Sequence, residues 1–170
     1  MVALPLSVGT TSEDEYIDID FDEIVEEQEV LQRFDEAFGG GIVVTAVKRV
    51  GEGDISLKKL DEARYRVEVE LKEPFVPDIG AFLSRDSIIV SKKSKSSVKD
   101  VDIKHDIKEL AVTAAEGKYL TLTMALPAGN EYNVKPELVV EAMDKYIEDF
   151  DAVFVQCHRT ALLGGGKEFI

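Results

Sequence analysis

The chain has very few of the side chains that build metal, redox and thiol sites. Its 170 residues include one Cys, two His and no Trp. A lone Cys excludes an intramolecular disulfide, and Cys157 and His158, as neighbours on a strand, point to opposite faces of a sheet. They are therefore too poorly placed to share a metal or to act as a thiol and its base. We expect no metal, no cofactor and no catalytic residue in this chain, and we expect Cys157 to be a small core residue.

Long apolar runs and export signals are also missing. No apolar stretch approaches the roughly 20 residues that a membrane-spanning helix needs. The first residues show neither the charged region nor the apolar region of a secretory signal. With 45% hydrophobic residues the chain can still bury a core. These features favour a soluble, cytoplasmic protein.

Basic charge is scarce and unevenly placed. The formal net charge of -14 repels phosphate backbones and argues against a general nucleic-acid binder. Residues 13–36 hold twelve acids and one Arg, whereas residues 92–108 hold six Lys. The run that contains Lys92, Lys93, Lys95 and Lys99 is the local feature that opposes the global charge. It is a candidate phosphate-binding surface, and the alternative is an ordinary solvated loop.

Hydrophobic periodicity predicts the secondary structure. Helical spacing predicts one helix that ends at Phe38 before three glycines and another that begins at Pro136, with a helical turn over 78–83. A strand that becomes a helix near 107–112 is expected within 101–112. Alternation or β-rich composition predicts strands over 15–21, 41–50, 64–71, 87–92, 119–126 and 152–157.

This order of elements predicts an α+β fold. We expect a mixed, largely antiparallel sheet with helices on one face, and two packed ferredoxin-like βαβ units would satisfy that order. One domain is expected over residues 1–163, followed by a flexible tail over 164–170.

The most polar cluster, His158, Arg159 and Thr160, follows the apolar part of the final strand. Strand ends often carry sites, and an imidazole beside a guanidinium can recognise phosphate or carboxylate. The structural alternative is that Arg159 pairs with one of the many acids and that His158 caps the strand.

The chain contains, in order, the segments Leu4–Gly9, Ser12–Ile19, Tyr65–Val67, Phe82–Leu83 through Asp86–Ile88, the lysine run leading into Val101–Ile103, Asn133–Val139 and His158–Thr160. Together they resemble the bacterial radical-SAM-linked family, which is domain of unknown function 2344. Members of this family typically begin with a further strand and helix, so the resemblance implies an N-terminally shortened chain. Such domains occur fused to, or encoded beside, radical-SAM proteins.

The resemblance implies a radical-SAM partner. A radical-SAM enzyme holds its iron–sulfur cluster with three closely spaced Cys, and this chain has one, so the cluster belongs to the partner. The leading hypothesis is a non-catalytic accessory module that presents a substrate to that partner, with RNA bound through the lysines and Arg159. One alternative is a small enzyme that acts on an anionic or nucleotide substrate with His158 and Arg159. Another is a structural module that dimerises through an apolar edge.

Overall fold

The computed structural model describes residues 1–93, 98–129 and 131–169 and shows an α+β fold. Its main sheet has five strands in the order β1–β7–β2–β6–β5. β1 runs parallel to β7, and the other neighbours are antiparallel, which confirms the predicted fold class. Two packed ferredoxin-like units are not confirmed. The strands are β1 (Thr11–Ser12), β2 (Leu60–Leu71), β5 (Glu109–Glu116), β6 (Tyr119–Pro127) and β7 (Ala152–Gly164).

Strand β2 forms the centre of the sheet because it pairs with both β6 and β7. Tyr65, Val67, Val69 and Leu71 are buried, and the residues between them are more exposed, as the alternation predicts. Burial of each such side chain stabilises the fold by about 1.5–3 kcal/mol. The strongest pattern in the sequence thus forms the strand on which the rest of the sheet assembles.

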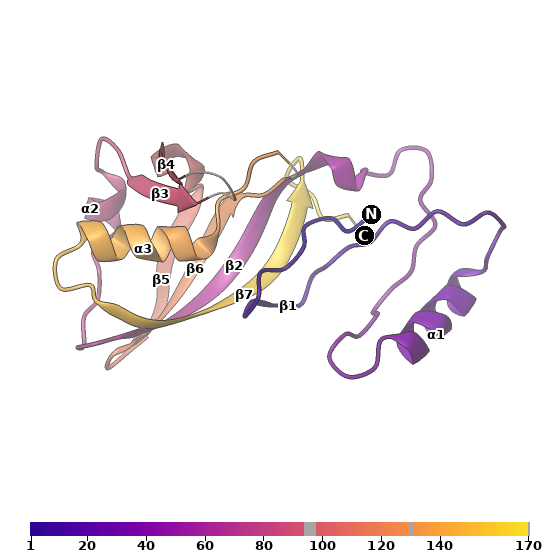
Figure 1. The fold of residues 1–170 in the computed structure, drawn as a ribbon, viewed down its shortest axis with the longest axis horizontal. Coiled ribbons are helices and arrows are strands. Elements are labelled where there is room, and N and C mark those ends of the chain that lie inside the picture. Colours follow the sequence, from indigo (N-terminus) through magenta and orange to yellow (C-terminus); the bar gives the residue numbers. More distant parts are fainter. Residues whose placement is uncertain (94–97, 130, 170) are drawn as a thin grey trace.

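One face of the sheet is covered by α3 (Pro136–Tyr146), α2 (Ile79–Leu83) and a hairpin of β3 (Ile89–Lys93) and β4 (Val98–Asp102) (Figure 1). Both helices lie near the predicted positions. Val139 and Met143 of α3 are fully buried in the core, and Tyr146 bonds through its hydroxyl to the backbone of Ile89. Among the described residues, no helix combines the length and apolar character needed to cross a bilayer.

Helix α1 (Glu27–Ala37) lies beyond the end of the sheet, apart from the other helices (Figure 1). Its bounds confirm the predicted helix. The strands predicted over 15–21 and 41–50 are wrong, because Ile17 makes only an isolated bridge to Val2 and residues 42–50 pair with no strand of the described chain. A segment with alternating apolar residues forms a strand and buries those side chains only where another strand pairs with it. We call residues 19–54, which include α1, the α1 lobe.

The helix predicted near 107–112 is also wrong. A short 3₁₀ turn, η2 (Lys104–Asp106), follows β4, and the chain then enters β5, which pairs with β6. Pairing with a long neighbouring strand overrides the weak local preference of this segment. His105 is exposed on the 3₁₀ turn.

The final strand is longer than predicted and continues to Gly164. Gly165 and Gly166 then turn the chain at positive φ, and the Phe169 ring packs edge-on against Tyr16 with 5.3 Å between centroids. Phe169 is 8% exposed and belongs to the core. The division into a domain and a tail stays a prediction, although the Gly165 N–H donates to the Asp61 carboxylate at 3.2 Å and Phe169 packs in the core.

Candidate functional site

The sheet separates the predicted polar cluster on β7. Arg159 shares the covered face with Cys157, and both are 3% exposed, whereas His158 lies on the open face and is half-buried. Successive residues of a strand point to opposite faces, so His158 and Arg159 do not meet. Thr160 is half-buried and falls where the pairing register with β2 shifts.

Arg159 fastens the N-terminal segment to the sheet. Its Nη1 donates to both carboxylate oxygens of Glu15, at 2.7 and 2.9 Å, and to the carbonyl oxygen of Leu4 at 2.8 Å. The Leu162 N–H donates to the carboxylate of Asp14 at 2.7 Å, and the Glu13 N–H donates to the Arg159 carbonyl at 3.1 Å. We call these contacts the N-terminal latch. The Arg159 side chain is 4% exposed, so it does not reach a surface ligand such as RNA.

A small depression of about 40 Å³ lies beside Arg159. It is lined by Tyr65 and Arg159 from the sheet, by the 4–10 segment that the latch holds, and by residues 133–137 at the start of α3. Two polar atoms there, Arg159 Nε and Glu137 Oε2, are buried and have no hydrogen-bond partner among the described residues. Segments far apart in the sequence therefore converge on one partly unsatisfied polar site.

Burial controls the titration of the groups around this depression. It raises the pKa of Tyr65, although the charge of Arg159 opposes the shift, and it raises the pKa of Glu15 although Ser12 and Arg159 favour the charged form. Burial, followed by the charge of Glu137, raises the pKa of Cys157 to about 12. The Cys157 thiol is therefore protonated at neutral pH and is a poor nucleophile, and its 3% exposure confirms the expected core position.

The open face of the sheet carries a transverse row of polar side chains. The strand registers align Thr11 with His158, His158 with Arg66, and Arg66 with Thr123. Thr11 Oγ1 and His158 Nδ1 are 2.7 Å apart, and His158 Nε2 is 3.7 Å from Glu13. Arg66 is exposed and forms no ion pair with a described residue. The sequence reasoning missed Arg66, although the alternation of β2 puts it on the polar side.

The β3–β4 hairpin carries the lysine run. The register places Lys92 opposite Lys99. Lys92 Nζ donates to the Asn133 carbonyl at 2.6 Å and lies 4.8 Å from the Tyr132 ring centroid, so it is held against the neighbouring loop. Lys99 is exposed. The side chain of Lys93 and the whole of Lys95 lie outside the described residues.

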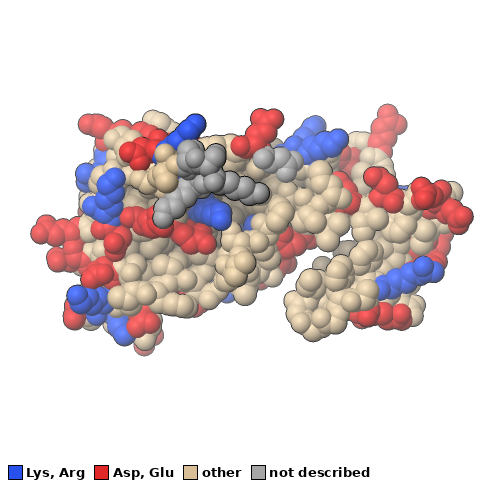
Figure 2. Space-filling view, viewed as in Figure 1, with Lys and Arg blue, Asp and Glu red and all other residues tan. Residues whose placement is uncertain are grey.

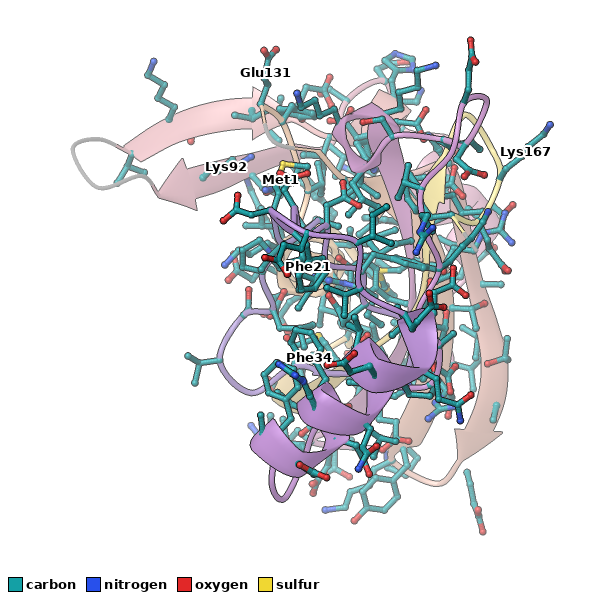
Figure 3. The ribbon with its side chains drawn as sticks, turned by 90° about the vertical axis from the view of Figure 1, so that its right-hand side faces the viewer. Met1, Phe21, Phe34, Lys92, Glu131 and Lys167 are labelled. Atoms are coloured by element: carbon teal, nitrogen blue, oxygen red, sulfur yellow. The ribbon has the colours of Figure 1, made fainter. Side chains whose placement is uncertain are left out.

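The α1 lobe contains a groove of about 280 Å³ that the sequence did not predict. Phe21 and Phe34 both line it, and Figure 3 shows both on the side of the molecule that carries α1. Acidic side chains lie along the upper, right and lower edges of the lobe in Figure 2, and the basic group in the lining, Arg33, is paired with Glu29 at 2.5 Å. The remaining apolar lining consists of Ile24, Val25 and Val30. We call this feature the α1 groove.

Exposed apolar side chains gather on the same part of the chain. Ile17, Ile19 and Phe21 are each roughly half exposed, at 51%, 44% and 51%, and Ile24 is 86% exposed. In the other arm of the lobe, Ile42, Val43 and Val50 are also exposed, at 60%, 77% and 65%. Large exposed apolar patches with a charged rim are often sites of protein–protein contact.

In the part of the chain that the structure describes, no three or more His, Cys, Asp or Glu side chains come together as a metal-binding group.

Comparison with known proteins identifies a family and nothing closer. Residues 1–136 match the family model described as an uncharacterized protein conserved in bacteria (DUF2344). The match covers the N-terminal side of the latch, the α1 lobe, the β3–β4 hairpin and all described strands except β7, which carries the other side of the latch. His158, Arg159 and Thr160 lie outside it. Neither the curated proteins nor the solved structures contain a match to the chain.

Proposed function

The chain belongs to the uncharacterised bacterial family DUF2344, and we propose that it acts as an accessory module that docks a radical-SAM protein through the α1 groove. One observation supports this proposal above the others: a groove lined by Phe21, Ile24 and Phe34 is exposed on a lobe that lies apart from the folded core (Figure 1). An exposed apolar groove beside a helix suits a protein segment that inserts apolar anchors. The resemblance to the radical-SAM-linked family supports the choice of partner.

The charge around the groove defines the docking segment. Residues 13–36 hold twelve acids and one Arg, and that Arg is already paired with Glu29. A partner segment with apolar anchors flanked by Lys or Arg would meet a complementary field, which speeds association and disfavours acidic competitors. We therefore expect a basic amphipathic segment on the radical-SAM protein.

The experiment co-expresses the chain with a radical-SAM protein from the same genome and measures co-purification and affinity. Ile24→Glu places a charge in the groove and should weaken binding at least about tenfold, since truncating or charging a central anchor costs 2 kcal/mol or more. Val8→Glu is the matched control, because Val8 is fully exposed and lies outside the groove. Glu23→Lys should also weaken binding, more strongly at low salt, whereas Glu73→Lys should not.

Light scattering and the same binding measurement also test whether a second copy of the chain occupies the α1 groove. A stable homodimer that Ile24→Glu dissociates, seen by light scattering, would make the occupant a second copy and contradict the proposal. Equal binding by the Ile24→Glu and Val8→Glu variants would also contradict it.

RNA binding is a second candidate, favoured by the register that brings Lys92 and Lys99 together on one hairpin. It predicts a salt-dependent RNA mobility shift that is lost when Lys92, Lys93, Lys95 and Lys99 are all changed to Glu. Lys58→Glu with Lys59→Glu, on an exposed turn before β2, is the control. No shift at low salt would remove this candidate.

A further inference from the structure

Strand β5 forms a long free edge of the main sheet. It has eight residues and lies at one end of the strand order, where it pairs with β6. In the described part of the chain, no backbone hydrogen bond joins residues 109–116 to any segment other than β6. The opposite edge is closed by β1, which has two residues. Short edge strands resist pairing with other chains, whereas a long one offers unpaired N–H and C=O groups to a further strand.

The side chains that β5 places on the open face are small at its centre and acidic at its ends. Ala111 lies opposite Thr123, in the row of the open face that contains Arg66. Between the two acids, residues 110–115 include no charge and no Pro. Neither acid forms an ion pair with a described residue. The open-face side chains of β5, all exposed, are Glu109, Ala111, Ala114 and Glu116.

A β-bulge keeps these side chains on one face. The pairing register with β6 shifts between Val112 and Ala114, so Thr113 is the extra residue. The Thr113 hydroxyl donates to the Thr121 carbonyl of β6 at 3.2 Å. The side chain of the bulged residue therefore turns toward β6 and leaves the free edge open.

The bulge also fixes the spacing that a further strand must have. Glu109 and Glu116 are seven positions apart in β5, whereas their partners in β6, Ala125 and Tyr119, are six positions apart. A regular strand on the free side of β5 would face the same bulge. Its two side chains opposite the acids would therefore also be six positions apart.

The charges of β5 select the strand that fits. If two copies paired antiparallel over the whole strand, Glu109 would lie opposite Glu116 at both ends, and like charges directly opposite are destabilising. We infer that β5 accepts a β-strand of another protein that carries Lys or Arg six positions apart, opposite the two acids. The face between these bases should carry large apolar side chains, because Ala111 and Ala114 leave room beside them. Backbone hydrogen bonds supply affinity in such strand addition, and alternate side chains supply specificity.

A capped, fluorescent peptide, Lys-Thr-Val-Thr-Val-Thr-Lys, tests this inference by fluorescence anisotropy with the full chain. It should bind saturably at low salt. The matched peptide with Glu in place of both Lys should bind at least about tenfold more weakly, since two attractive pairs become like-charge contacts. The double variant Glu109→Lys with Glu116→Lys should reverse this preference. The control, Glu141→Lys with Glu148→Lys, makes the same change of net charge at exposed positions elsewhere and should still prefer the lysine peptide.

Hydrogen exchange locates the bound peptide. The lysine peptide should protect backbone amides of residues 109–116, and the Ile24→Glu variant should bind it as well as the unchanged chain does. Protection confined to the α1 lobe, or loss of binding in Ile24→Glu, would overturn the inference. The absence of saturable binding at low salt, an unchanged preference in the double variant, or a homodimer of the free chain that protects residues 109–116 would overturn it too. None of these results depends on whether a radical-SAM protein docks at the α1 groove.

Discussion

Replacing Arg159 with Met tests the N-terminal latch. The substitution keeps an unbranched side chain but removes the guanidinium that bonds Glu15 at 2.7 and 2.9 Å and the Leu4 carbonyl at 2.8 Å. Removing one member of a buried ion pair costs about 3–5 kcal/mol. Glu15 remains 30% exposed and can regain some hydration, which lowers that cost, while the unpaired Leu4 carbonyl adds to it. We expect a loss of about 3 kcal/mol.

Urea unfolding followed by circular dichroism measures this loss as a shift of the midpoint at constant slope. The control is Arg64→Met, since Arg64 is 49% exposed and its bond to Glu62 is 3.1 Å long, so that the change should cost under about 1 kcal/mol. Hydrogen exchange of residues 2–18 should accelerate in Arg159→Met well before global unfolding. Equal stability of the two variants would refute the view that Arg159 fastens the N-terminal segment.

Two further predictions concern titration. Because burial and the charge of Glu137 raise the pKa of Cys157 to about 12, iodoacetamide at neutral pH should modify the native chain far more slowly than the urea-unfolded chain, and comparable rates by mass spectrometry would contradict this. Asp102 accepts hydrogen bonds from the Ile88 and Lys104 N–H groups, which lower its pKa below 3.8. Its stabilisation is present above pH 3.8 and disappears as the pH falls through the lowered value. The Ile88 amide should therefore lose exchange protection in acid, and Asp102→Asn should show no such pH dependence.

Local periodicity correctly predicted the strands and helices whose own alternation or helical spacing determines which side chains are buried. Strand β2, strand β6 and helix α3 follow from alternation or helical spacing, because each buries one face against the same core. The pattern over 15–21 failed because burial of a strand also needs a partner, and Ile17 finds only Val2. The helix expected near 107–112 failed because β6 supplied a partner there.

The contacts of the site residues could also be predicted only in part, because they depend on segments far apart in the sequence. Strand alternation separated Cys157 from His158 in the sequence analysis, and it separates His158 from Arg159 for the same reason. The partner of Arg159 was unpredictable, since Glu15 is one of twelve acids in its stretch and lies 144 positions away. The sequence indicated Glu137 only weakly as a site residue, through its place after Pro136 in the first turn of a predicted helix.

Hydrogen exchange of the chain with and without the proposed radical-SAM partner tests the docking proposal most directly. Binding at the α1 groove should protect backbone amides of residues 21–34 strongly and leave the open face of β2 and β6 unchanged. The Ile24→Glu variant should show no protection at the same partner concentration. Protection confined to the open face or to the β3–β4 hairpin, with residues 21–34 exchanging as in the free chain, would contradict docking at the α1 lobe.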